Sequence, residues 1–565
     1  MEWNSFVIRS GTRGSGLKAD RIISTNNKNS DNTLKQGTIL AVASVLSRII
    51  GMLYRSPMTH IIGDEGNGLY GYAFEIYSYA LILSTYCMPL AVSKLLSARF
   101  ATKEYHNGMK IFRASMLFSV ISGGIMALLV FAFAGVIERF TGYDGVALPL
   151  RILAPTIFVV AIAGTLRGFF QSRKTMLPTA LSQLGEQVIN AIVSIVAPIG
   201  FITLATNALD RASYGAAGGT LGTLFGALAG VFFLIFLYVI YKPRMERHLS
   251  HDKAGETLTN GETVRLLAAT ILPIILSQAV YQSIGILDGT LFGKLYTGED
   301  KTVLYNLYSG KYRLMVNVPN AISSSLASSM IPNLVSLYTL GHMTEFRRRL
   351  GNTMKFNMII AFPCAAGLAA LSSPILRLLF PTTDYTVSGQ MLFVGAIAVI
   401  FYALSTVSNA ALQGLDRLNL PLRHAAISLA IHLVLIIFLL CRTDLGAFAL
   451  VIGNITYPLI VCILNWISVA KHASYHQEVR TTFLLPAASA LAMGVVTWIV
   501  RKLLSFILPD SYWTNLLIIL VCMVLAVVIY FVLIFKTGAL RKEDMPEFPM
   551  GMRIYRVAKK LHLME

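Results

Sequence analysis

Two arginines lie inside the first apolar segment of this 565-residue chain, in the stretch SRIIGMLYRSP (47–57). Arg48 and Arg55 are seven residues apart, so in a helix they share one face. Guanidinium groups bind phosphate and pyrophosphate in a bidentate way. A central arginine costs roughly 2.5–3.5 kcal/mol in a membrane, so the pair predicts an anion-binding site. The alternative is pairing with carboxylates that merely locks helices together.

Polar residues at helical spacing recur in other apolar segments, and such rows need to face protein or a water-filled cavity. Lys311 and Arg313 lie nearer the outer end of their predicted span. For them the alternative to substrate binding is that the side chains extend to the membrane surface. For Asp288 and Glu75 the alternative is a structural ion pair, and for the amides it is hydrogen bonding between helices. The residues that we predict to bind substrate are Arg48, Arg55, Glu75, Glu186, Gln187, Asp288, Lys311, Arg313, Asn317 and Asn409.

These residues belong to a chain that is 55% hydrophobic and only 13% charged, against about 25% charged in soluble domains. Its mean hydropathy is +0.64. Apolar runs of about 20 residues recur from Gly37 to Lys536, which is typical of a helical membrane protein and not of a β-barrel. We therefore predict an all-α polytopic membrane protein with about 14 transmembrane helices.

The net charge of +19 is distributed in a way that disfavours nucleic acid as the partner. Most Lys and Arg fall in the two termini and in every second connection, and the positive-inside rule then places both termini in the cytoplasm. The polar segment 1–36 is predicted to be a disordered tail, and 537–565 a basic tail. The remaining positive charge is expected to attract the anionic headgroups of membrane lipids.

Short motifs repeat between the two halves of the chain. VLSR (45–48) matches ILSQ (275–278), and PLAVS (89–93) matches PNAIS (319–323), both at an offset of 230 residues. An even number of spans in each copy makes the halves parallel repeats, with the substrate site between them. The predicted parts are a first lobe (37–241), a cytoplasmic linker (242–263), a second lobe (264–470) and helices 13 and 14 (471–536).

Several kinds of site are not expected. The five cysteines and ten histidines show no metal-ligand spacing, so no metal or other cofactor is predicted. No GxxxxGK[ST] motif occurs, which disfavours direct use of ATP. The deep charges are more basic than acidic, and the chain therefore favours an anionic, phosphate-bearing cargo.

The motifs also resemble a known group. SRIIGMLYR, PLAVSKL, LRGFFQSRKTMLPTALSQLGEQVIN, SGKYRLMVNVPNAISSSLASSMIPNL and LQGLDRLNLP are similar to polysaccharide-biosynthesis flippases of the stage V sporulation protein B and YtgP type. These are related to the MurJ lipid II flippases of the multidrug/oligosaccharidyl-lipid/polysaccharide exporter superfamily. The resemblance implies two six-helix lobes in a V around a central cationic cavity, with two C-terminal helices that shelter a lipid tail.

The resemblance further implies a bacterial cell-membrane protein that turns an undecaprenyl-pyrophosphate-linked saccharide to the outer leaflet by alternating access. It implies that Arg48 and Arg55 match the basic residues of the family's first helix, and Lys311 and Arg313 those of its eighth. Where MurJ-type proteins bring an arginine from the second helix, this chain has Glu75, which leaves open whether lipid II is the cargo. A monomer is expected, with cell-wall synthesis enzymes as possible partners.

Two other functions compete with this interpretation. A multidrug antiporter of the same superfamily would carry organic cations, which Arg48 and Arg55 would repel. A membrane-embedded glycosyltransferase would need a carboxylate or histidine cluster for acid–base chemistry. The largest internal connection has only His248, His251 and Asp252, which fit a solvated loop, so we predict that the protein is not an enzyme.

Overall fold

The computed structural model describes residues 43, 46–84, 87–173, 175–250, 252, 257–381, 385–415, 417, 419–541, 555–556 and 559–560. The predicted tail 1–36 and most of the predicted tail 537–565 lie outside these residues. The helices are α2 (Arg55–Ser84), α3 (Met88–Ala101), α4 (Tyr105–Thr141), α5 (Ala147–Ser172), α6 (Leu177–Ile202), α7 (Ala208–Leu249), α8 (Asn260–Leu295), α9 (Lys301–Asn306), η1 (Leu307–Tyr312), α10 (Arg313–Thr339), α11 (Met343–Ala370), α12 (Ser372–Leu379), α13 (Thr386–Gly395), α14 (Ala398–Gly414), α15 (Asn419–Arg442), α16 (Phe448–Ala473), η2 (Arg480–Leu484), α17 (Leu485–Ile507) and α18 (Tyr512–Lys536).

Gly63 marks the point where the first two apolar segments meet. Its backbone angles (φ 73°, ψ 175°) interrupt the helical geometry of α2, and glycine adopts such angles without a steric penalty. The hydroxyls of Tyr54 and Tyr70 lie 3.2 Å apart, although the two residues are 16 positions apart in the sequence. In one straight helix their backbones would be separated by about 24 Å along the helix axis, more than the two side chains can bridge. The chain therefore reverses direction at Gly63.

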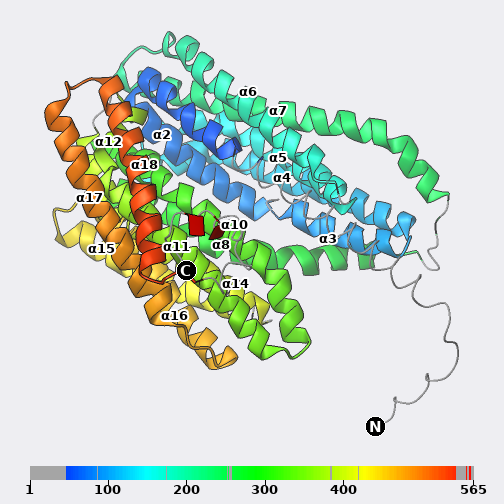
Figure 1. The fold of residues 1–565 in the computed structure, drawn as a ribbon. Helices are drawn as coiled ribbons and strands as arrows, with labels where there is room; N and C mark the ends of the chain where they lie inside the picture. Colours follow the sequence, from blue (N-terminus) through cyan, green and yellow to red (C-terminus); the bar gives the residue numbers. More distant parts are fainter. Residues whose placement is uncertain are drawn as a thin grey trace, which may run out of the picture.

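The helices form two bundles (Figure 1). Helices α2 to α7 pack against one another as a first lobe, and α9 to α16, with η1 between α9 and α10, pack together as a second lobe. Helix α8 contacts α2, α3 and α4 of the first lobe and α15 of the second, so it joins the lobes. Helices α17 and α18 cover the two predicted C-terminal spans and pack against α11 and α12.

The direct contacts between the lobes gather near the turn at Gly63. Nδ2 of Asn67 donates to Oδ1 of Asn306 at 2.5 Å, and the Tyr72 hydroxyl lies 2.8 Å from Oγ1 of Thr290. The ring of Tyr72 also packs against Tyr305 of the second lobe, with ring centres 5.5 Å apart. These contacts hold the two lobes together at one end of the molecule.

The prediction of an all-α polytopic membrane protein is confirmed, but the number of 14 spans is not. Among the described residues, 10 helices are long and apolar enough to cross a membrane, or 11 if Thr386–Gly395 and Ala398–Gly414, bent by 44°, form one span. Arg55–Phe100 counts as a single span in that number, although the chain reverses at Gly63. The first predicted span, 37–61, begins outside the described residues.

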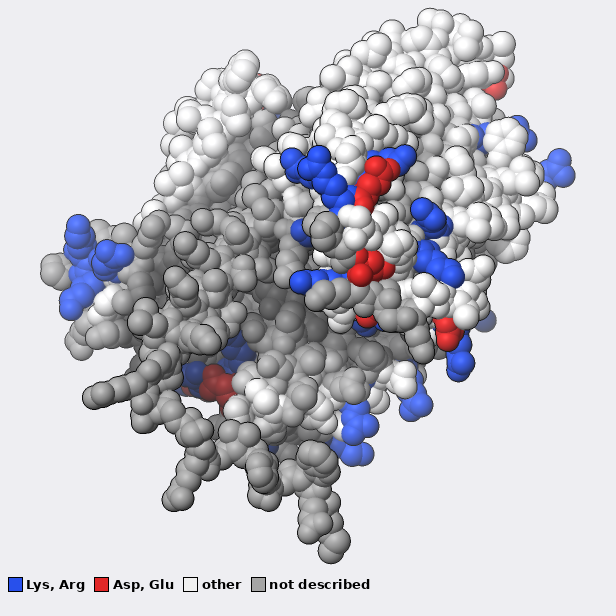
Figure 2. Space-filling view, turned by 90° about the vertical axis from the view of Figure 1, so that its right-hand side faces the viewer, with Lys and Arg blue, Asp and Glu red and all other residues white. Residues whose placement is uncertain are grey.

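The connection between α7 and α8 is more ordered than predicted. Helix α7 continues to Leu249, so it takes up part of the predicted linker 242–263. Asp252 accepts a hydrogen bond of 2.7 Å from the backbone N–H of Tyr105 at the start of α4, which docks the connection onto the first lobe. Lys and Arg side chains gather on the face at which the long extension of α7 ends, interspersed with Asp and Glu (Figure 2).

Candidate functional site

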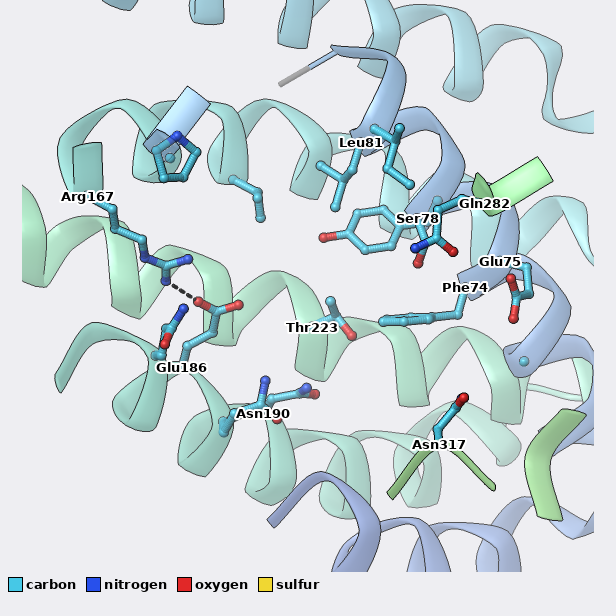
Figure 3. Close-up of a pocket in the computed structure, with 18 of the residues that line it drawn as sticks. Phe74, Glu75, Ser78, Leu81, Arg167, Glu186, Asn190, Thr223, Gln282 and Asn317 are labelled. Carbon is cyan, nitrogen blue, oxygen red and sulfur yellow. Dashed lines mark hydrogen bonds and ion pairs between the residues drawn. The ribbon is translucent and has the colours of Figure 1, made fainter. Parts of the chain in front are cut away.

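A cavity of about 740 Å³ lies between the two lobes (Figure 3). Its walls come from α2, α3, α5, α6 and α7 of the first lobe and from α8, η1 and α10. This position agrees with a substrate site between the halves of a transporter. The charged side chains that line the cavity in the described part of the chain are Arg55, Glu75, Arg167, Glu186 and Arg313.

Arg55 is a cationic group of this cavity that has no carboxylate partner among the described residues. Its guanidinium carbon lies 5.7 Å from the ring centre of Tyr70, a cation–π contact made possible by the reversal of the chain at Gly63. The backbone carbonyl of Arg55 accepts a hydrogen bond of 2.8 Å from the hydroxyl of Thr59. An arginine on an aromatic face keeps its N–H donors available for an anion.

Arg313 and Glu75 form an ion pair between the lobes. Nη1 of Arg313, at the start of α10, lies 2.6 Å from Oε1 of Glu75 on α2. Gly285 of α8 allows this approach, because a Cβ there would collide with the Glu75 carboxylate and lie 3.0 Å from Nη1 of Arg313. The pair is therefore both a wall of the cavity and a link between the lobes.

Arg167 was not predicted from the sequence. Its Nη2 lies 2.6 Å from Oε2 of Glu186, and its Nε donates to the hydroxyl of Ser182 at 3.2 Å. Arg167 and Gln171 are four residues apart on α5, and both line the cavity. That spacing was the available signal. Figure 3 shows the Arg167–Glu186 pair at one end of the cavity and Glu75 at the other.

Neutral polar groups line the cavity between its charged ends. Thr223 lies between Asn190 and Phe74 in Figure 3, and Oε1 of Gln183 is buried with no hydrogen-bond partner among the residues that the structure describes. Amide and hydroxyl groups both donate and accept hydrogen bonds, which suits the hydroxyls of a sugar. The amide side chains of the cavity are Gln171, Gln183, Gln187, Asn190, Gln282 and Asn317.

The profile of the family described as "Polysaccharide biosynthesis protein" matches residues 33–338, which is more than half of the chain. The chain belongs to this family. It is 24% identical to the "Lipid II flippase MurJ" of Bacillus subtilis (strain 168), over 90% of this chain and 96% of that protein. It is also 24% identical to the "Stage V sporulation protein B" of the same organism, over 84% and 90% of the two chains. The resemblance inferred from the motifs is confirmed.

Solved structures with the same fold include two kinds of transporter. "Lipid II flippase MurJ, inward closed conformation" covers 87% of this chain and 98% of its own at 16% identity, with a TM-score of 0.63. An inward-facing "multidrug resistance MATE family transporter of the MOP superfamily" covers 76% and 96% at 13% identity, with a TM-score of 0.61. At these sequence identities, the similarity to the solved structures supports the fold of this chain and not its function.

Two predicted residues lie away from the cavity, on other faces of their helices. Lys311 is buried, with Nζ 3.0 Å from Oδ1 of Asp64. It is two residues from Arg313, and such a spacing places side chains on different helix faces. Asp288 is also buried, and its Oδ1 lies 2.6 Å from Nε2 of His432 on α15. The structure therefore brings neither Lys311 nor Asp288 to the cavity lining.

Arg48 and Asn409 do not line the cavity either. Arg48 lies in the helical residues that precede α2, and its side chain is exposed. Arg55, in contrast, is half-buried and lines the cavity. Oδ1 of Asn409 accepts a hydrogen bond of 2.7 Å from Asn465, within the second lobe. The predicted residues that do line the cavity are Arg55, Glu75, Glu186, Gln187, Arg313 and Asn317.

Proposed function

We propose that the protein is a flippase that carries an undecaprenyl-pyrophosphate-linked saccharide from the inner to the outer leaflet of a bacterial cell membrane. The observation that supports this most directly is the guanidinium of Arg55, which lines the inter-lobe cavity without a carboxylate partner among the described residues. A pyrophosphate supplies the anionic oxygens that such a group binds. The similarity to proteins named lipid II flippase supports a cargo of this class.

The alternative is a cation antiporter like the multidrug transporters that share the fold. An organic cation needs a carboxylate that is available to it. Both carboxylates of the cavity, Glu75 and Glu186, are engaged by arginines at 2.6 Å, which leaves the positive charge of Arg55 in excess. This charge balance favours an anion.

The orientation is part of the same proposal. The positive-inside rule places both termini in the cytoplasm, and the basic face in Figure 2 then meets the anionic inner leaflet. Cargo enters the cavity from that side. We assign no catalytic role to any cavity residue, because translocation leaves the covalent structure of the lipid unchanged.

The experiment is a leaflet-accessibility assay in proteoliposomes with a fluorescently labelled undecaprenyl-pyrophosphate saccharide. Arg55→Gln should slow flipping about 10- to 100-fold, the value of one or two lost charged hydrogen bonds. Arg48→Gln is the matched control, because it removes the same charge from the same segment outside the cavity. Its effect should be much smaller.

Three results would count against the proposal. Equal losses for Arg48→Gln and Arg55→Gln would contradict the assignment of the anion site to the cavity. Unchanged flipping by Arg55→Gln would contradict the role of its charge. Export of a cationic dye by protein that moves no lipid would support the antiporter.

A further inference from the structure

A buried acid–imidazole pair lies in the second lobe, apart from the cavity. Asp288 of α8 and His432 of α15 are both buried, and Nε2 of His432 lies 2.6 Å from Oδ1 of Asp288. Neither residue lines the cavity. Ionisable side chains inside a membrane are costly to bury, which makes such a pair a candidate functional element.

We propose that Asp288 and His432 form a proton-binding site that couples the movement of the lobes to a proton gradient. Nε2 of the imidazole faces the carboxylate, while Nδ1 is buried beside the backbone of Gly453 on α16, which interacts with the ring. With one proton on the imidazole the pair carries one net negative charge, and with two it is electrically neutral. Histidine is the side chain best suited to such a change near neutral pH.

The described side chains that contact the pair are tyrosines, which are neutral. The Tyr308 hydroxyl of η1 donates to Oδ2 of Asp288 at 3.4 Å, and the ring of Tyr457 of α16 packs edge-on against His432 at 5.9 Å. Tyr402 of α14 is close enough to interact electrostatically with Asp288. No group of three or more His, Cys, Asp or Glu in the described residues is arranged to hold a metal ion.

The site is connected to the ion pair between the lobes by two routes. Along α8, Asp288 is three residues from Gly285, which lies against both Glu75 and Arg313. Along η1, Tyr308 contacts Asp288 and lies five residues before Arg313, the first residue of α10. The η1 segment is a π-helix, a form that is frequent at functional sites. A change of charge at the pair is therefore felt at the Glu75–Arg313 link.

One part of the proposal rests on the proposed function, namely that the coupled movement is lipid flipping. Proteoliposomes containing the labelled saccharide lipid would be given a pH gradient while the membrane potential is clamped with potassium and valinomycin. If one proton is coupled to each lipid, the ratio of lipid between leaflets should shift by up to about tenfold per pH unit. His432→Gln and Asp288→Asn should still flip lipid but lose this shift.

His424→Gln is the matched control. His424 lies on the same helix and is also buried, but its ring nitrogens meet neutral partners, Asn465 at 2.7 Å and Ser468 at 3.1 Å. This variant should keep the response to the gradient. A gradient response that survives in His432→Gln, or is absent from wild type that flips lipid, would overturn the coupling.

A second measurement tests proton binding without any transport. ¹⁵N NMR of histidine-labelled wild-type protein in nanodiscs should show the His432 ring gaining a proton as the pH is lowered. The signal is assigned by its loss in His432→Gln or, if that variant does not fold, by its shift in Asp288→Asn. A ring that stays in one state would make the pair a structural contact. Titration in protein that moves no lipid would support the site and contradict the flippase.

Discussion

Nη1 of Arg313 in the second lobe lies 2.6 Å from Oε1 of Glu75 in the first lobe, at the wall of the cavity. The same guanidinium thus serves the contact between the lobes and the electrostatics of the site. Under the proposed function, an anion that enters the cavity should compete with Glu75 for Arg313. We then expect binding of cargo and separation of the lobes to be linked through this one side chain.

The first prediction concerns this ion pair. Glu75→Gln should loosen the contact, because removing one partner of this half-buried pair leaves the charge of Arg313 uncompensated. Spin labels at exposed Leu209 and Leu445, in a background without the five native cysteines, should report a longer and broader distance distribution. The charge exchange Glu75→Arg with Arg313→Glu should restore much of the original distribution. An unchanged distribution in Glu75→Gln would show that the pair does not hold the lobes.

The second prediction concerns Gly285. Gly285→Ala should disrupt the Glu75–Arg313 pair, since the added methyl collides with the Glu75 carboxylate. The control is Gly367→Ala on α11, where a Cβ meets nothing within 4 Å and where alanine is favoured over glycine by about 1 kcal/mol in a helix. Thermal unfolding in detergent and the flipping assay should both be impaired in Gly285→Ala alone. Equal behaviour of the two variants would contradict the crowding argument.

The third prediction concerns the other end of the cavity. Arg167→Gln leaves Glu186 as an unpaired negative charge that repels a pyrophosphate, so flipping should fall. The double variant with Glu186→Gln removes that charge and should recover part of the rate. A double-mutant cycle of flipping rates should give a coupling of about 0.5–3 kcal/mol. Additive losses would show that the two residues act independently.

The fourth prediction concerns the start of α8, outside the membrane. Hydrogen bonds from the backbone N–H and hydroxyl of Thr259 lower the pKa of Glu262. Because the folded pKa is depressed, the stabilisation is present above the unfolded pKa of glutamate and is lost as pH falls through the folded value. Hydrogen exchange of the first turn of α8 should therefore reveal weaker protection at acidic pH after correction for intrinsic rates.

Glu262→Gln is the control for this effect. Glutamine keeps a side-chain oxygen that accepts from Thr259 but does not titrate in this range. The variant should lose the pH dependence of protection. If it behaves like the wild type, another group is responsible.

The fold class and several cavity residues were accessible from the sequence because they depend on local patterns. Long apolar runs predict membrane helices, and a polar residue inside such a run needs a polar environment. The structure accordingly places Arg55, Glu75 and Glu186 at one cavity. The reversal at Gly63 is what brings Arg55 over Tyr70.

The ion-pair partners of the charged residues could not be predicted from the sequence, because they depend on how helices that are distant in the sequence pack. Lys311 is paired with Asp64 at 3.0 Å, across 247 positions of the sequence. Asp288 faces α15, where His432 had no motif to mark it. Helical periodicity shows which residues share a face but not which neighbour that face meets.

The lining of the cavity has a consequence for the energetics of a transport cycle. With Arg55, Arg167 and Arg313 against Glu75 and Glu186, the empty vestibule carries one unit of positive charge. A diphosphate ester brings two negative charges and so reverses that sign. Under the proposed function, a voltage that is negative inside should pull the unloaded carrier inward and push the loaded one outward, so that both strokes run downhill in the same electric field.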